Sequence, residues 1–498
     1  MGGPVDASLK QRTLGNLALT AAARLVTLAL QLGANVVLAR SLTSADYGIV
    51  GYAQIFISFL ALVSEFGLNS AAIQRPQLSA PALHTGFTLR MLLGLAAFAL
   101  ALAVAPLAAL SLGEPAVADV VRLLAVGFLI NGLAFMPSVQ ALRQLDYAKF
   151  TAAQVAGSVV NAGITVWMAL AGFAFWSIVV ANVAAIAASA LLLNLLIRQP
   201  MRLALDPDST RHYAQFGGYL FVSWMLTFVI MNLDNLVIGT LMGPATLGYY
   251  ALAFGWGTKW CEMLSSVINS VLFPTFAKIQ SDLPRLRAAY VKSLELVAFL
   301  AAGGYVTLFV CSADFLHHLL GGGTDKWQPA LSTLRILCVY GLLRAMLEPV
   351  GSVVMAIGGI AVLVRANLLA AVVKVALIYP ALQNFGIAGV AVVVTVSYAA
   401  QYLVFLPALN KQLGLSLPAF LAPQWRPLLS GALTLASLSG IRQAGLLPDD
   451  VRAFWISAAL CAGIYLAAFG LLSRGAAYRE LYHLVRARLS RTSATAPP

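Results

Sequence analysis

Nine charged side chains lie within long apolar stretches of this sequence, where an uncompensated charge is costly. A charge near the centre of a membrane helix costs about 2.5–3.5 kcal/mol on insertion scales, so such residues usually face a bundle interior or water. There they can bind an anion, hold a proton or cation, or form a salt bridge. The nine residues are Arg24, Glu65, Asp234, Lys259, Glu262, Arg335, Arg344, Glu348 and Lys374.

Two pairs of these residues can neutralise each other on a single helix. Lys259 and Glu262 are three residues apart and therefore share a helix face. Arg344 and Glu348 are four apart and do the same. For both pairs a structural salt bridge and a ligand-binding role stay open. Arg335 lies close to a helix end and is expected to extend toward the membrane surface.

Four charges have no partner on their own helix. Arg24 lies near the middle of its span with no acid at matching depth nearby, which makes it the best candidate for binding an anion. Asp234 and Lys374 lie at similar depth, so they predict either a salt bridge or an ion-coupling site. Glu65, in the inner half of its helix, is likewise an ion-coupling or structural charge.

Aromatic, cysteine and histidine residues add little evidence for catalysis. Trp256 and Trp260 share helix surface with Lys259, so they pack in the core, face lipid or, in a cavity, stack on sugar rings. The four cysteines lie singly in apolar stretches, which predicts free thiols rather than a metal site or disulfide framework. His317 and His318 are expected in a solvated loop. Neither a cofactor nor a metal is predicted.

The elements that position these residues are membrane-spanning helices. Hydrophobic residues make up 60% of the chain and charged residues 10%, against roughly 25% charged residues in soluble domains. A helix needs about 20 mostly apolar residues to span a bilayer. The sequence predicts an all-α polytopic membrane protein with 14 spans. They are 14–38, 49–73, 85–110, 117–142, 151–172, 175–197, 213–242, 247–276, 291–311, 331–357, 361–382, 387–409, 427–441 and 454–472.

Positive charges alternate between the gaps that separate these spans. Of the 31 Lys and Arg residues, 21, with Arg90 among them, are assigned to one side and 5 to the other. The positive-inside rule then predicts that the rich side and both termini are cytoplasmic. Topology and anionic lipid headgroups explain the net charge of +13, so no nucleic-acid partner is expected.

An internal repeat appears at an offset of 200 residues. Residues 35–53 match residues 235–253 at five positions, including Gly48 with Gly248. A weaker match at an offset of 212 also relates the first six helices to the next six. The pattern predicts two six-helix lobes related by an axis along the membrane normal. The predicted parts are lobe 1–197, linker 198–212, lobe 213–410, extra helices 411–473 and cytoplasmic tail 474–498, with an amphipathic helix at 478–489 and then disorder.

Several short motifs resemble those of a known family. They are Leu42-Thr-Ser-Ala-Asp-Tyr-Gly-Ile49, Glu65-Phe-Gly-Leu68, Ala72-Ile-Gln-Arg75, Leu233-Asp-Asn-Leu-Val-Ile-Gly239, Leu247-Gly-Tyr-Tyr-Ala251, Phe273-Pro-Thr-Phe-Ala-Lys-Ile-Gln280 and Lys326-Trp327. In order and spacing they resemble bacterial Wzx-type oligosaccharide flippases of the multidrug/oligosaccharidyl-lipid/polysaccharide exporter superfamily. The resemblance covers nearly the whole chain.

The resemblance implies a central cationic cavity that opens alternately to each membrane face. It implies transfer of undecaprenyl-pyrophosphate-linked oligosaccharide to the periplasmic leaflet of the inner membrane, without catalysis. Implied partners are the lipid-linked glycan, membrane lipids, a polysaccharide polymerase and export machinery, and the protein is expected to be a monomer. Related flippases bind pyrophosphate through a helix-1 arginine and sodium near a helix-7 acid, positions matched by Arg24 and Asp234. Lys374 departs from the sodium pattern, which favours proton coupling or none.

Two other functions are compatible with a polytopic protein. A drug or organic-cation exporter of the same superfamily should have an acid-lined site, but the nine intramembrane charges comprise five bases and four acids. A membrane glycan polymerase or ligase needs a large extramembrane loop with catalytic groups. The longest outer gaps, 312–329 and 442–452, are short and poor in such groups.

Overall fold

The computed structural model describes residue 23 and residues 26–75, 77–144, 146–444 and 451–473. Regular structure in these residues is helical throughout, which agrees with the predicted fold class. Arg24 and the predicted amphipathic helix at 478–489 lie outside the described residues. The chain divides into two compact units, Met1–Ala251 and Leu252–Pro498, which are described separately as unit 1 and unit 2. The lobe boundaries given above stay a prediction.

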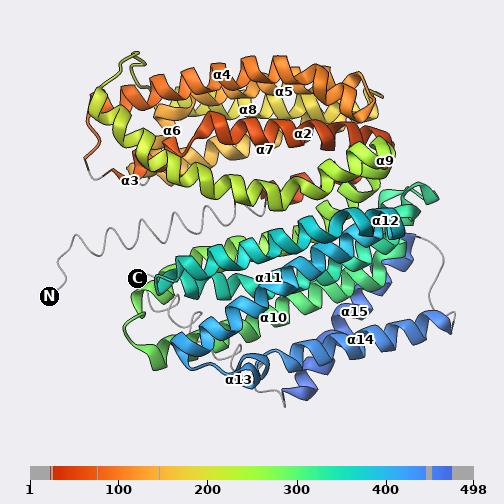
Figure 1. The fold of residues 1–498 in the computed structure, drawn as a ribbon. Coiled ribbons are helices and arrows are strands. Elements are labelled where there is room, and N and C mark those ends of the chain that lie inside the picture. Colours follow the sequence, from red (N-terminus) through yellow and green to blue (C-terminus); the bar gives the residue numbers. More distant parts are fainter. Residues whose placement is uncertain (1–22, 24–25, 76, 145, 445–450, 474–498) are drawn as a thin grey trace, which may run out of the picture. The chain divides into compact units, whose positions relative to one another are not determined.

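Unit 1 is a bundle of long helices that lie side by side (Figure 1). Helix α4 packs against α2 and α5, and α7 packs against α8. A short apolar helix, Val26–Ser41, precedes them. The unit contains α2 (Ser44–Glu65), α3 (Leu68–Gln74), α4 (Ala80–Leu112), α5 (Ala116–Leu133), α6 (Phe135–Arg143), α7 (Tyr147–Leu170), α8 (Trp176–Leu196) and the first part of α9 (Pro207–Lys278).

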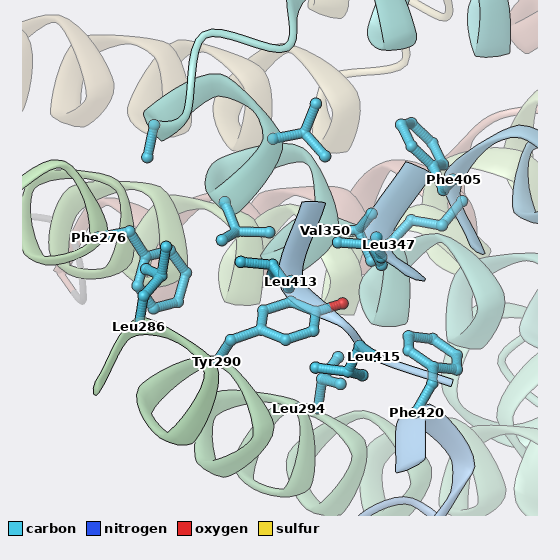
Figure 2. Packing of buried hydrophobic residues seen from close by; sticks show 14 of the residues in the cluster. Phe276, Leu286, Tyr290, Leu294, Leu347, Val350, Phe405, Leu413, Leu415 and Phe420 are labelled. Atoms are coloured by element: carbon cyan, nitrogen blue, oxygen red, sulfur yellow. The ribbon is translucent and has the colours of Figure 1, made fainter. Parts of the chain in front are cut away.

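Unit 2 is built around α10, which packs against α11, α14 and α15. One core joins the end of α9 to α10–α13, and Figure 2 shows Tyr290 and Leu294 of α10 packed among side chains of these helices. The unit contains the end of α9, α10 (Leu283–Asp314), η1 (Phe315–Leu320), η2 (Asp325–Ala330), α11 (Leu331–Ala356), α12 (Ile360–Leu413), α13 (Leu417–Leu421), α14 (Trp425–Gln443) and α15 (Val451–Leu472).

Ten helices of the described chain are long and apolar enough to cross a membrane. Two of them bend at a glycine where the sequence predicts a turn between spans. Gly243 in α9 has φ 80° and Gly386 in α12 has φ 59°, and this left-handed region is open to glycine at little cost. Two predicted spans therefore fall within each of these long helices.

The second predicted span, 49–73, is not one continuous helix. Helix α2 ends at Glu65, and α3 begins at Leu68. Between them Phe66 (φ 40°) and Gly67 (φ 68°) are both left-handed, which ends the α-helical hydrogen-bond pattern. A left-handed conformation costs a non-glycine residue about 1 kcal/mol or more, so surrounding contacts must hold Phe66 in place.

Candidate functional site

The two copies of the sequence repeat meet within unit 1. A side chain on Gly48 would collide with the backbone carbonyl of Pro244, and one on Gly248 would collide with that of Ser44. Gly248 is the counterpart of Gly48 in the repeat, and Pro244 is the counterpart of Ser44. Each glycine therefore contacts the counterpart of the residue that the other glycine contacts, as a local two-fold axis requires. We call this contact the glycine crossing.

The glycine crossing continues for one more turn of helix. A Cβ atom on Gly51 would lie 3.7 Å from the Cβ of Ala251, its counterpart at the 200-residue offset. On the α2 side the first turn is fixed by a capping box, in which Thr43 and Asp46 each accept a hydrogen bond from the other's backbone amide. Backbone approach this close requires glycine, so the two glycines set the separation of the repeats.

Asp234 of α9 is fully buried close to this region. The Tyr250 hydroxyl donates a 2.6 Å hydrogen bond to its Oδ2. Sequence reasoning missed this partner, although Tyr250 lies within the motif Leu247-Gly-Tyr-Tyr-Ala251. Lys374 is also buried, at 4% exposed, but it belongs to unit 2. The predicted Asp234–Lys374 pair thus stays a prediction.

Glu65 and Arg90 form the second charged group of unit 1. Glu65 is the last residue of α2, and the Asn69 amide donates to its Oε1 at 3.5 Å. Arg90 lies ten residues into α4 and is 7% exposed. Glu65 is the acid that acts electrostatically on the Arg90 guanidinium. On the same face of α4 as Arg90, a Cβ on Gly94 would lie 3.9 Å from the Ser64 Oγ, so this face looks toward the end of α2.

The polar atoms of this group are incompletely paired. Arg90 Nε and Nη1, Ser64 Oγ and Asn69 Oδ1 are buried and have no hydrogen-bond partner among the described residues. We call Ser64, Glu65, Asn69 and Arg90 the break cluster, because they surround the α2–α3 break. Arg90 was counted among the bases of the positively charged side, which stays a prediction; the structure adds that its side chain is buried.

At the end of α3 nearest the start of α4, arginine side chains fix the backbone. Arg143 Nη1 donates to the carbonyl oxygens of Ala72 at 3.0 Å, Ile73 at 3.1 Å and Arg75 at 2.5 Å. These carbonyls are the ones that a helix C-terminus leaves unpaired, so Arg143 caps α3. Arg75 Nη1 in turn donates to Ser209 Oγ at 2.9 Å.

In unit 2 the first predicted pair, Lys259 and Glu262, forms a salt bridge. Lys259 Nζ lies 3.1 Å from Glu262 Oε2, with 30% and 48% of the two side chains exposed. Thr258 also donates to Glu262, at 3.4 Å. The structural bridge allowed by the three-residue spacing is therefore present. A role for Lys259 in binding substrate stays a prediction.

The second predicted pair belongs to a larger polar network. Ser265 Oγ donates a 2.6 Å hydrogen bond to Glu348 Oε1. Arg344 interacts electrostatically with Glu348 and with Tyr340 and Tyr398, whose rings meet edge-to-face with centroids 4.9 Å apart. The network thus joins α9, α11 and α12, and spacing along α11 alone could not show its partners on other helices.

The two tryptophans of α9 pack against other elements of unit 2. The Trp260 Nε1–H donates to the Leu300 carbonyl of α10 at 3.0 Å. The Trp256 ring meets Phe315 edge-to-face, with centroids 4.9 Å apart. Arg335 is partly exposed, and its Nε donates to Ser312 Oγ at 3.0 Å. Stacking of either tryptophan on a sugar ring stays a prediction.

Among the described residues, no group of three His, Cys, Asp or Glu side chains is arranged to hold a metal ion. His317 Nδ1 lies 2.8 Å from Asp325 Oδ1 in a partly exposed ion pair. The described cysteines are buried free thiols.

A sequence-family model described as polysaccharide biosynthesis protein matches residues 37–332. Over 357 residues the chain is 28% identical to the lipopolysaccharide biosynthesis protein WzxC of Escherichia coli strain K12, covering 70% of this chain and 71% of that protein. It is 25% identical over 313 residues to the succinoglycan biosynthesis transport protein ExoT of Rhizobium meliloti strain 1021, covering 61% of each.

Solved structures share the fold. The lipid II flippase MurJ in an inward closed conformation has a TM-score of 0.75 at 12% identity, covering 93% of this chain and 100% of that one. A multidrug resistance MATE family transporter of the MOP superfamily, in an inward-facing conformation, has a TM-score of 0.63 at 16% identity, covering 77% and 94%. At these identities the likeness concerns the fold alone.

Proposed function

We propose, because the chain belongs to the polysaccharide biosynthesis protein family, that it is a flippase for undecaprenyl-pyrophosphate-linked oligosaccharide. It moves this glycan from the cytoplasmic to the periplasmic leaflet of the bacterial inner membrane for surface polysaccharide assembly. The observation that carries the proposal is the family match over residues 37–332. Relatives named for lipopolysaccharide and teichuronic acid biosynthesis and for succinoglycan transport support it.

The charged residues within the apolar helices suit this task. Phosphates and sugar hydroxyls cannot enter hydrocarbon unpaired, because each such group costs several kcal/mol. Fixed cations along a protected path replace their hydration, while the polyprenyl chain stays in lipid. Arg24 is proposed to bind the pyrophosphate, since guanidinium contacts phosphate in a bidentate manner. Lys259 and Arg344 add further positive charge, and Trp256 and Trp260 offer surfaces for sugar rings.

The proposed architecture has fourteen spans in two six-helix lobes plus two extra helices, with both termini cytoplasmic. The left-handed glycines within α9 and α12 support the count, because each falls at a predicted turn. At the glycine crossing, Gly48 contacts Pro244 and Gly248 contacts Ser44, and this symmetric pair of contacts supports the repeat. Alternating access then requires the two repeats to separate at one membrane face while they meet at the other.

The protein is proposed to be a transporter without catalytic activity of its own and to act as a monomer. A flipped lipid-linked repeat unit is the substrate that a periplasmic polymerase needs. The proposed partners are therefore a polysaccharide polymerase and the export machinery that follows it.

A disulfide across the glycine crossing tests the mechanism. Gly51→Cys with Ala251→Cys places two Cβ atoms 3.7 Å apart, within the disulfide range of about 3.5–4.5 Å. Oxidation should close the bond and stop glycan transfer, and a reductant should restore it. The measurement is the exposure of lipid-linked glycan at the outer leaflet, detected in spheroplasts with membrane-impermeant periodate.

The controls are the two single-cysteine variants and the Gly51→Ser, Ala251→Ser double variant, which cannot cross-link. If the oxidised double-cysteine protein transfers glycan as fast as the reduced protein, the glycine crossing does not open during transport. If all variants and the parent protein fail to expose glycan at the outer leaflet, the flippase proposal itself is wrong.

A further inference from the structure

Helix α10 begins in a charged segment that extends beyond the hydrocarbon of a membrane. The candidate span Leu283–Leu320 has 38 residues, which at 1.5 Å per residue is about 57 Å, whereas the whole bilayer is about 40–45 Å thick. Arg285, Arg287, Lys292 and Glu295 all lie near the start of α10, and the apolar part of the helix follows them. The first turns of α10 are therefore placed among lipid headgroups when this apolar part lies in hydrocarbon.

Helix α15 covers α10 only along the apolar part. The Phe299 and Phe469 rings have centroids 4.5 Å apart, and a Cβ on Gly303 would lie 3.0 Å from the Tyr465 ring. These two contacts show that the helices run in opposite directions. Because α15 ends three residues after Phe469, it ends level with about residue 296 of α10.

Helix α14 stops covering α10 at the same level. An ion pair between Arg442 and Asp314 joins the last turns of the two helices, and a Cβ on Gly431 would lie 4.0 Å from the Ala302 Cβ. The two helices therefore run in the same direction. Because α14 begins six residues before Gly431, its start is also level with about residue 296 of α10.

Below this level the same face of α10 forms an open groove, which we call the α10 groove. Spacings of three and four residues place its lining on one face of the helix, the face that meets α15 at Phe299 and α14 at Ala302. A Cβ on Gly414, the residue that caps α12, would lie 3.9 Å from Arg287 Nη1, so this guanidinium is at one edge. The lining residues are Pro284, Arg287, Ala288, Val291, Lys292 and Glu295.

The α10 groove combines positive charge with an adjoining apolar surface. Its lining has two bases and one acid, and both bases are exposed. A headgroup with one negative charge therefore neutralises the groove, whereas a zwitterionic headgroup leaves it positive. From Lys292 the helix continues at four-residue spacing to Leu296 and Leu300, which are 58% and 39% exposed. These leucines offer an acyl chain a track toward the membrane centre.

We propose that the α10 groove binds one anionic phospholipid of the phosphatidylglycerol type. Arg287 and Lys292 contact its phosphate, the guanidinium in a bidentate manner, and one acyl chain lies along Leu296 and Leu300. The lipid covers the part of α10 that lies beyond the ends of α14 and α15. Its binding needs no glycan and is therefore independent of the proposed transport function.

Photocrosslinking in liposomes identifies the occupant of the groove. The full chain, with p-benzoylphenylalanine in place of Ala288, is reconstituted in phosphatidylethanolamine with a minority of phosphatidylglycerol, and mass spectrometry counts the adducts of each lipid after irradiation. The same reporter in place of Leu368, which is 55% exposed on α12, gives the ratio for an open lipid-facing position. The ratio of phosphatidylglycerol to phosphatidylethanolamine adducts should be at least about fivefold higher at position 288, which is the preference that one base near a membrane surface supplies.

Three variants separate a specific site from general positive charge. Arg287→Gln with Lys292→Gln should lower the ratio at position 288 to the value at position 368. Arg202→Gln with Arg365→Gln removes two exposed bases from other parts of the chain and should leave the ratio unchanged. Glu295→Gln should raise the ratio, because the net charge of the groove rises by one, and a misfolded protein cannot give this gain.

Two results would overturn the proposal. The first is an equal ratio of adducts at positions 288 and 368, which would mean that the groove does not select an anionic headgroup. The second is a crosslink from position 288 to residues 474–498, because the chain's own tail would then fill the groove. If the headgroup is held by charge, high salt should also lower the ratio at position 288.

Discussion

The Arg90 site of unit 1 and the charged groups that α9 and α11 contribute to unit 2 differ in how closely they are paired. In unit 2 these charged groups have close partners. Lys259 lies 3.1 Å from Glu262, and Glu348 accepts a 2.6 Å hydrogen bond from Ser265. In unit 1 Arg90 is 7% exposed and keeps two guanidinium nitrogens without a hydrogen-bond partner among the described residues, while Glu65 acts on it electrostatically.

This difference distinguishes charges that stabilise the fold from charges whose environment can change during transport. A closed pair offsets its own desolvation and has little reason to move. A buried charge without a close partner costs stability and persists only where function requires it. Unit 1 also contains the strained α2–α3 break and the glycine crossing. The buried Arg90 and the two sites of constrained backbone therefore occur in the same unit.

Replacement of the unpaired arginine should give the largest functional effect. Arg90→Met removes a buried charge whose desolvation is not repaid, so the melting temperature should stay the same or rise. Glycan transfer per folded molecule should fall at least about tenfold, equivalent to about 1.4 kcal/mol. Thermal unfolding and outer-leaflet glycan exposure measure the two quantities.

The matched control for this change is Arg344→Met in unit 2. That variant removes the cation beside Glu348, so it should lower the melting temperature. If Arg90→Met is destabilised as strongly as Arg344→Met, Arg90 is a structural charge and the contrast between the units fails.

Loss of the Ser265–Glu348 hydrogen bond in unit 2 should lower stability and leave glycan transfer unchanged, the opposite of the effect expected for Arg90→Met. Ser265→Ala leaves a partly buried Glu348 oxygen without its donor, which costs about 1–3 kcal/mol of unfolding free energy. Transfer per folded molecule should be close to that of the parent protein, because the contact joins α9 to α11. Denaturant unfolding measures the stability, and glycan transfer divided by the amount of protein in the membrane measures the transport activity. Normal stability with lost transfer would place Ser265 and Glu348 in the transport path.

Hydropathy predicted the helices and several turns well, because the length of an apolar run decides a span. The turns at Gly243 and Gly386 fall between predicted spans for this reason. The break at Phe66 was missed, since an apolar run of the right length conceals a local change of backbone direction. Glu65 of α2, which acts electrostatically on the buried Arg90, lies 25 residues before it in sequence, so no local pattern could show this environment. The spacing of Lys259 and Glu262 did predict their ion pair, because that contact is local.

Removal of a partly exposed charge in unit 2 should give the smallest effect on stability. The Lys259–Glu262 bridge is about a third to a half exposed, and bridges of this kind contribute about 0–1 kcal/mol. Lys259→Gln keeps the length and polarity of the side chain, so the unfolding free energy should change by less than about 1 kcal/mol. Glu262→Gln, its partner, should behave alike if the bridge is only structural. If Lys259→Gln reduces glycan transfer severalfold while Glu262→Gln does not, the ammonium binds the passing phosphate, and unit 2 also contributes a functional charge.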